Sequence, residues 1–255
     1  MLLRDKDNPP WNSIIAVLFW LFSILVILIA QGAAAAAYSS YSGLSLENSF
    51  KDPSMLVATI IAVLPAHIVT LAVGWMIVTR MGTYSFSKML GMEWGGFRWW
   101  HLILMLLAMV SLFALFLALF GEKENDFDKL LKSSRGAVYA VAFIATFSAP
   151  IVEEVVYRGV FYGAVRRSFN TFAAVLLISV LFAGVHLPQY WGDLATISSL
   201  FTLSVGLTLV RAFTRNLLPC IVLHFVFNGI QTTLLVLEPW IKPYLDKPVV
   251  TGFFN

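Results

Sequence analysis

GAVYAVAFIATFSAPIVEEVVYRGVFYGAV, residues 136–165, reads as a helix long enough to cross a lipid bilayer, yet it carries Glu153 and Glu154 side by side. One carboxylate near the bilayer centre costs about 2.5–3.5 kcal/mol on insertion scales. Two adjacent carboxylates cost more, because their charges repel each other. Ionisable residues in membrane helices usually serve chemistry or transport, so this stretch indicates a functional site within a membrane fold.

The composition of the whole chain favours a membrane protein. Of its 255 residues, 59% are hydrophobic and 12% are charged, whereas soluble domains average about 45–50% and 25%. The mean hydropathy is +0.83. Because the apolar residues lie in long blocks, we predict an all-α fold, a polytopic membrane helix bundle with about seven transmembrane helices.

Seven apolar segments are the expected spans, and they cover residues 11–37, 54–79, 99–120, 136–165, 171–187, 194–213 and 217–237. Pro65 is expected to kink the second span, and residues 121–134 to form a charged, solvated loop. We divide the single membrane domain into N-terminal spans (1–134), a core (135–237) and a short tail (238–255). The aromatic residues of the tail suit a membrane interface, and they are Trp240, Tyr244, Phe253 and Phe254.

Lysine and arginine counts predict the orientation. One set of loops carries nine of these residues, namely Arg4, Lys6, Arg80, Lys88, Arg98, Arg166, Arg167, Arg211 and Arg215. The other set carries seven. The majority places the N-terminus in the cytoplasm, and the size of the chain suggests a prokaryotic cell membrane. Because these charges lie at helix ends, we expect the lipid bilayer as a partner and no nucleic acid.

The polar residues inside the spans form pairs four positions apart, which places both members of a pair on one helix face. The pairs are Glu154 and Arg158 in EEVVYR, Phe182 and His186 in FAGVH, and His224 and Asn228 in HFVFN. Counted at about 1.5 Å per residue, three helices bring Glu153, His186, His224 and Asn228 to overlapping depths. Glu153 points about 100° away from Glu154 around the helix, so the two glutamates are expected to differ in role.

The motifs E-E-x-x-x-R, F-x-x-x-H and H-x-x-x-N, in this order, resemble those of the CPBP (Abi) family of intramembrane proteases, which are of the type II CAAX prenyl endopeptidase kind. The resemblance covers about residues 135–237. It implies a hydrolase, a membrane-embedded glutamic endopeptidase that uses no cofactor. Its substrate would be a membrane-associated protein or peptide, prenylated or not, and it would be cut in a cavity open toward the cytoplasm.

The resemblance also implies a role for each motif residue. Glu153 and His186 would activate a water molecule, and His224 and Asn228 would form an oxyanion hole. Glu154 would pair with Arg158 and support the site, and Phe182 would pack against its own histidine face. Pro150 is expected to free a backbone carbonyl and to open a polar cavity.

Several alternatives stay open at the level of sequence. Glu153, His186 and His224 form a possible zinc ligand set, although H-E-x-x-H is absent. Cys220 shares a helix face with His224 and would allow a cysteine nucleophile. Two alternatives belong to other functional classes. One is a non-enzymatic scaffold or immunity protein of the same fold, and the other is a transporter with a carboxylate proton relay. His67 and His101 are interpreted as packing residues.

Overall fold

The computed structural model describes residues 6, 8–121 and 123–245, and this part of the chain contains helices and no strands. Six helical stretches are long and apolar enough to cross a membrane. They are α1 (Ser13–Ser42), α3 with α4 (Pro53–Ile61 and Val63–Thr79), α6 (Trp99–Phe120), the series from α8 to α10 (Arg135–Ser168), α12 (Leu194–Thr214) and α13 (Leu218–Leu245). The prediction of a polytopic helical bundle is confirmed.

The fifth expected span is helical but short. It forms α11 (Thr171–His186), which has 16 residues, whereas a spanning helix needs about 20. Helix α11 packs along α12 and follows directly on α10, and one of its faces is exposed, with Phe172, Leu176 and Val180 on it. The chain is therefore an integral, multi-pass membrane protein, and its described residues contain six long apolar helices and one short one.

The second span is interrupted next to its proline. Helix α3 ends at Ile61 and α4 begins at Val63, with Ala62 between them. Pro65 has no N–H to donate, and its ring clashes with the carbonyl of the residue four positions earlier, which is Ile61. The kink predicted from Pro65 is thus present.

The fourth span contains two segments of π-helix. It runs through α8 (Arg135–Phe143), η1 (Ile144–Ser148), α9 (Ala149–Glu153), η2 (Glu154–Phe161) and α10 (Tyr162–Ser168). In η1 the Ala149 N–H donates to the Ile144 carbonyl, five residues earlier. The next bond of this register would run from residue 150 to Ala145, and Pro150 cannot make it. Pro150 therefore frees the Ala145 carbonyl, at the turn that precedes the glutamates.

The segment expected to be a solvated loop contains a helix, α7 (Asp126–Ser133). Asn125 and Asp128 cap it reciprocally, because each side chain accepts from the other's backbone N–H. Leu131 is buried against α8, and Phe127 packs beside it. The prediction was wrong for these residues, because the apolar face of α7 was hidden among the charges.

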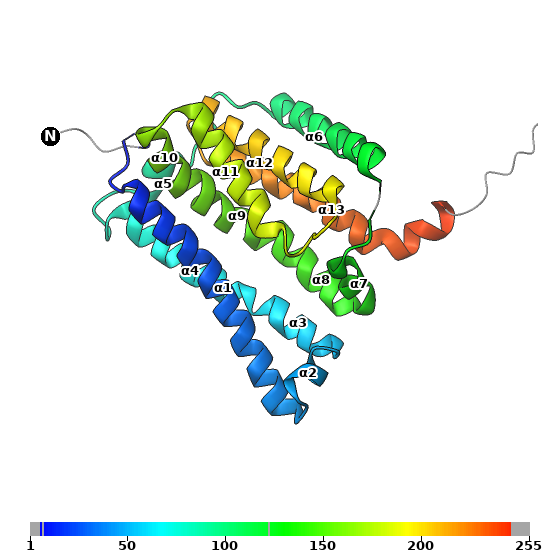
Figure 1. The fold of residues 1–255 in the computed structure, drawn as a ribbon. Helices are drawn as coiled ribbons and strands as arrows, with labels where there is room; N and C mark the ends of the chain where they lie inside the picture. The colour runs from blue at the N-terminus through cyan, green and yellow to red at the C-terminus, as the bar shows by residue number, and fades with distance from the viewer. Residues whose placement is uncertain (1–5, 7, 122, 246–255) are drawn as a thin grey trace, which may run out of the picture.

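The helices surround the fourth span. Figure 1 shows α8, α9 and α10 along the middle of the molecule, with α11, α12 and α13 on one side and α1, α3 and α4 on the other. Helix α6 packs on the outside of α12, and two short helices, α2 (Leu46–Ser49) and α5 (Phe86–Leu90), lie in connections. Helix α13 continues past the predicted end of the last span, and Phe253 and Phe254 lie outside the described residues.

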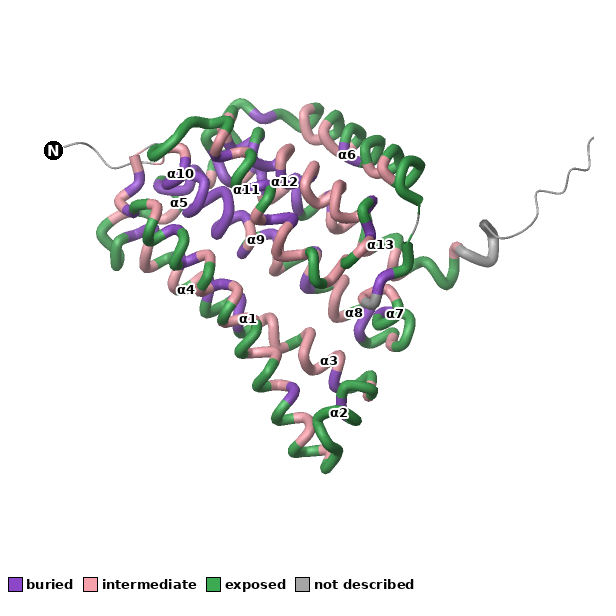
Figure 2. The backbone as a smooth tube through the Cα atoms, in the orientation of Figure 1, coloured by how far each residue is buried: buried purple, intermediate pink, exposed green. Residues whose placement is uncertain are grey.

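Burial identifies which surfaces face lipid. In Figure 2 the buried residues gather around α9, α10 and α11, whereas α1 and α6 are exposed along much of their length. Large apolar side chains lie on those exposed faces, among them Leu18, Leu25 and Leu28 on α1 and Leu104, Leu107 and Leu119 on α6. Contiguous apolar surface of this kind fits a hydrocarbon environment.

Candidate active site

The two glutamates lie at the junction of α9 and η2 and have different surroundings. Glu153 ends α9, and 25% of its side chain is exposed, toward a cavity that it lines. Glu154 begins η2, and its side chain is completely buried. The two adjacent carboxylates therefore differ in exposure, and their separate roles stay a prediction.

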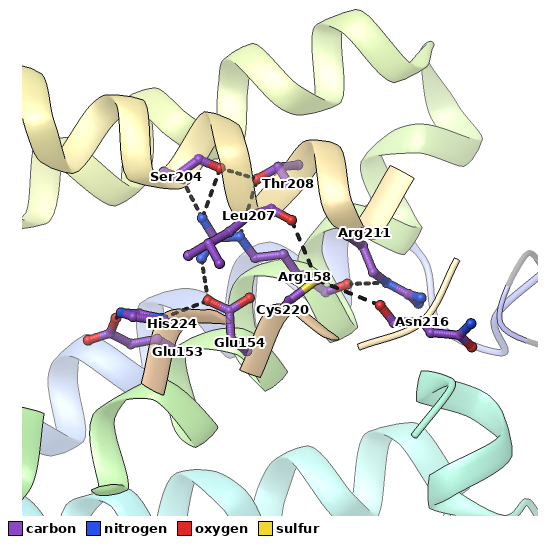
Figure 3. A network of polar contacts seen from close by, with 10 residues as sticks. All are labelled: Glu153, Glu154, Arg158, Ser204, Leu207, Thr208, Arg211, Asn216, Cys220 and His224. Atoms are coloured by element: carbon purple, nitrogen blue, oxygen red, sulfur yellow. Dashed lines mark hydrogen bonds and ion pairs between the residues drawn. The ribbon is translucent and has the colours of Figure 1, made fainter. Parts of the chain in front are cut away.

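Glu154 pairs with Arg158, as predicted from their spacing. Arg158 Nη1 donates to Glu154 Oε1 at 2.8 Å, and both side chains are fully buried. Helix α12 supplies the remaining acceptors, because Arg158 Nη2 donates to Ser204 Oγ at 2.6 Å and Nε donates to Thr208 Oγ1 at 3.2 Å (Figure 3). Buried charges are tolerated only when they are paired and hydrogen-bonded, and this network meets both conditions.

Phe182 contributes more than packing. The Arg158 guanidinium carbon lies 4.9 Å from the centre of its ring, at the distance of a cation–π contact. The rings of His186 and His224 lie 5.0 and 6.1 Å from the same ring. Phe182 therefore contacts both histidines and the Arg158 cation.

His224 lies between the two glutamates (Figure 3). Its Nδ1 is 2.9 Å from Glu154 Oε1, and its Nε2 is 3.8 Å from Glu153 Oε2. Glu154 Oε1 thus serves both Arg158 and His224, whereas Glu154 Oε2 is buried without a hydrogen-bond partner in the described part of the chain. The contact between Glu154 and His224 joins residues 70 positions apart, and the sequence did not indicate it.

Backbone carbonyls orient the side chains of His186 and Asn228. His186 Nδ1 lies 2.7 Å from the Phe182 carbonyl oxygen. Because a carbonyl can only accept, Nδ1 carries a proton, and Nε2 is the ring nitrogen that remains for a group in the cavity. Asn228 Nδ2 donates to the Ala145 carbonyl at 2.9 Å, the carbonyl that Pro150 frees. One N–H of the Asn228 amide remains for another acceptor.

One cavity of about 610 Å³ brings the predicted residues together. Glu153, His186, His224 and Asn228 line its polar part. Apolar side chains from α1, α3, α7 and α13 line the rest, including Ile27, Leu56, Ile60, Phe127, Leu130 and Leu235. The volume lies within the range of ligand pockets, about 300–1,000 Å³.

The cavity extends toward the face of the bundle that carries α7. Its lining includes Phe127 and Leu130 from α7 and Tyr190 from the loop before α12. The N-terminal segment lies at the other face, where the Trp11 indole donates to the Val160 carbonyl and Arg167 donates to the Pro9 carbonyl. The cytoplasmic N-terminus and the opening of the cavity toward the cytoplasm both stay predictions.

His67 has a further role beside the one interpreted from the sequence, and Cys220 bears on one of the alternatives. His67, interpreted as packing, is buried on α4, bonds Ser148 Oγ at 3.0 Å and lines the cavity with Glu153. Cys220 is completely buried, and its thiol lies 3.4 Å from the Leu207 carbonyl, away from the residues that line the cavity. This burial, outside the lining of the cavity, argues against the cysteine nucleophile. His101 caps the start of α6, and its ring contacts that of Trp100 at a tilted angle, as a packing residue does.

Tyr190 at the cavity wall is a further polar residue that the sequence did not single out. Its ring meets Phe127 of α7 edge to face, and Gln189 donates to its hydroxyl at 3.1 Å. Desolvation raises the pKa of Tyr190 to about 12, so its hydroxyl stays neutral and can donate a hydrogen bond.

The zinc alternative can be compared with the placement of the possible ligands. No three side chains of His, Cys, Asp or Glu within residues 6, 8–121 and 123–245 are placed to hold a metal ion. Nδ1 of His224 and Nδ1 of His186 contact Glu154 and the Phe182 carbonyl, an arrangement that zinc-bound histidines also have at their second ring nitrogen, so the zinc alternative stays a prediction.

Comparison with known families agrees with the motifs. Residues 135–230 match the family described as Type II CAAX prenyl endopeptidase Rce1-like, so this stretch carries a domain of that protease family and the resemblance is confirmed. The matched residues contain all three motifs, and α1 to α7 lie outside them. Searches of curated proteins and of solved structures found no match to the chain.

Proposed function

We propose that this membrane protein, with its domain of the type II CAAX endopeptidase kind, is an intramembrane glutamic endopeptidase. The observation that carries the proposal is the arrangement around the cavity. A partly exposed glutamate, two histidines and an asparagine from three helices face one space, and a buried ion pair supports them. Such a constellation suits the hydrolysis of a peptide bond.

Glu153 and His186 activate the water molecule. The Glu153 carboxylate takes a proton from a water molecule, and the free Nε2 of His186 accepts the second O–H and orients that water. The resulting hydroxide attacks the peptide carbonyl carbon. When the C–N bond breaks, Glu153 returns its proton to the leaving amine, so the carboxylate is regenerated.

His224 and Asn228 stabilise the oxyanion of the tetrahedral intermediate. Asn228 offers the amide N–H that is not bonded to Ala145. His224 donates through Nε2 while Nδ1 donates to Glu154, so the ring carries both protons when it acts. Glu154 is a positioning residue in this scheme, because it holds His224 and the Arg158 charge without facing the cavity.

The cavity supports a membrane-associated substrate. Its apolar wall is formed by α1, α3, α7 and α13 and would receive an apolar segment, such as a hydrophobic peptide or a prenylated C-terminus. No residue of the wall selects a prenyl group by chemistry, so we propose the broader class. The substrate enters from the face that carries α7.

Comparison of peptide termini in membranes tests this function. Cells that produce the wild type, Glu153→Ala or the control Glu47→Gln are compared by mass spectrometry, because Glu47 is an exposed carboxylate outside the cavity. We expect a set of new peptide termini with the wild type and the control that is absent with Glu153→Ala. Identical termini in all three, while deletion of the protein still changes the cells, would favour a non-enzymatic scaffold.

A further inference from the structure

All three glutamines of the chain line the active-site cavity. Gln31 belongs to α1, Gln189 to the loop after α11, and Gln231 to α13. These distant positions in the sequence converge on one space, although none of them belongs to the three motifs. A glutamine in a membrane helix commonly hydrogen-bonds a neighbouring helix, so a purely structural role would show in bonds of that kind.

The fold uses little of the hydrogen-bonding capacity of these side chains. Gln189 Nε2 donates to the Tyr190 hydroxyl at 3.1 Å, which leaves its second N–H and its carbonyl oxygen. The side chains of Gln31 and Gln231 make no hydrogen bond to any other residue that the structure describes. Their amide groups are therefore available to a molecule in the cavity.

Helix geometry directs the two membrane glutamines into the cavity. Gln231 follows Asn228 by three residues and precedes Leu235 by four, and all three line the cavity. It lies about 4.5 Å along the helix from Asn228, toward the end where Leu235 packs against the cluster of α7 and α8. On α1, Ile27 and Gln31 share one face in the same way. The free amides thus lie beside the catalytic residues, on the walls that lead to α7.

We propose that the three glutamines bind the main chain of an unwound peptide substrate. This inference rests on the proposed endopeptidase function and narrows its substrate class. In a helix, each peptide carbonyl accepts from an N–H of the same helix, so the segment to be cut has to be unwound before its carbonyl can meet the oxyanion donors. Unwinding leaves main-chain N–H and C=O groups without partners, which is costly in apolar surroundings.

Glutamine suits this task because its carboxamide carries both N–H donors and a carbonyl acceptor. It can therefore pair with both polar groups of a main chain. It carries no charge, so it does not select an anionic or a cationic ligand. A prenyl chain or a lipid tail has no group that could use these bonds, whereas the apolar wall residues Ile27, Leu56, Ile60 and Leu235 can receive the side chains of an apolar peptide.

The test measures cleavage by the purified full-length protein in detergent micelles. The substrate is an unprenylated peptide that spans one of the cleavage sites found by the comparison of peptide termini. A series of the same peptide has one peptide bond at a time replaced by an ester, at positions other than the scissile bond. An ester removes the main-chain N–H and keeps the side chains.

The variants Gln31→Met and Gln231→Met keep the length of the side chain and remove its amide. Thr233→Val is the matched control, because Thr233 is an exposed polar residue of α13 that does not line the cavity. Thermal unfolding confirms that each variant is folded.

We expect each methionine variant to raise KM at least about fivefold and to keep kcat within about a factor of two, because hydrogen bonds made equally in the substrate and the transition state are lost. For each of these two glutamines, an ester at one position of the peptide should raise KM for the wild type and for Thr233→Val, but not for the variant that lacks that glutamine.

The outcomes separate this inference from the proposed function. If Glu153→Gln has lost cleavage but both methionine variants have the KM of the control, the inference alone is overturned. The absence of an ester effect at every position in the wild type overturns it too, whatever the stability of the variants. Cleavage by Glu153→Gln at the wild-type rate would overturn the proposed function and the inference with it.

Discussion

The buried pair of Glu154 and Arg158 gives the most quantitative prediction. Replacing Glu154 with glutamine keeps the shape but leaves the Arg158 cation without its carboxylate, 2.8 Å away in a fully buried site. Breaking a buried pair by removing one partner costs about 3–5 kcal/mol. Ser204 and Thr208 still accept from Arg158, so we expect the lower end, about 3 kcal/mol of unfolding free energy.

Replacing Arg158 as well tests whether the ion pair, and not packing alone, accounts for the loss of stability. Arg158→Met alone should also be destabilising, because Glu154 then keeps only His224 as a partner. In the double variant Glu154→Gln/Arg158→Met neither charge is left buried and unpaired. We therefore expect its loss of stability to be smaller than the sum of the two single losses by at least about 1.5 kcal/mol.

Unfolding of the four proteins in mixed micelles of a mild detergent and dodecyl sulfate measures this coupling. Strict additivity would refute the reasoning, because it would mean that the two side chains do not depend on each other. Activity offers a second observable. Both single variants should lower kcat through His224, and the double variant should regain stability without regaining kcat, because the carboxylate that orients His224 is still missing.

Three further outcomes follow from the site. Asn228→Ala should lower kcat about 100- to 1000-fold with little change in KM, as loss of one oxyanion donor does; an unchanged kcat would remove Asn228 from the oxyanion hole. Pro150→Ala restores an N–H that competes with Asn228 for the Ala145 carbonyl, so kcat should fall by up to about tenfold, and Ile151→Ala, at an exposed position of the same helix, is its control. Cys220→Ala should leave kcat within about a factor of two, because the thiol bonds only to backbone carbonyls; inactivation of this variant with an intact fold would restore the cysteine nucleophile.

Much of the fold could be predicted because each membrane helix is a long, uninterrupted run of apolar residues in the sequence. Helix α6 has the predicted bounds, and the break beside Pro65 follows from the missing N–H of proline. The pairing of Glu154 with Arg158 follows from helix geometry, since only four residues separate them. These features are local, and local rules suffice for them.

The remaining features depend on contacts between distant segments. The bond from Glu154 to His224 needs α13 to pack against η2, and the place of His67 in the cavity needs α4 to pack beside α9. The π-helical register around Glu153 and Glu154 also has no simple signal beyond Pro150. Helix α7 was missed because its charges outweigh its apolar face in any average over the segment.

Cleavage of one of the identified peptides by purified Glu153→Gln is the most direct measurement of the central claim. Glutamine has the shape of glutamate but cannot take a proton from water, and general-base catalysis contributes about 100- to 10,000-fold. We predict that kcat falls at least about 100-fold while thermal unfolding and the Glu47→Gln control stay like the wild type. Cleavage by Glu153→Gln within about a factor of two of the wild-type rate would contradict the assignment of Glu153 as the base.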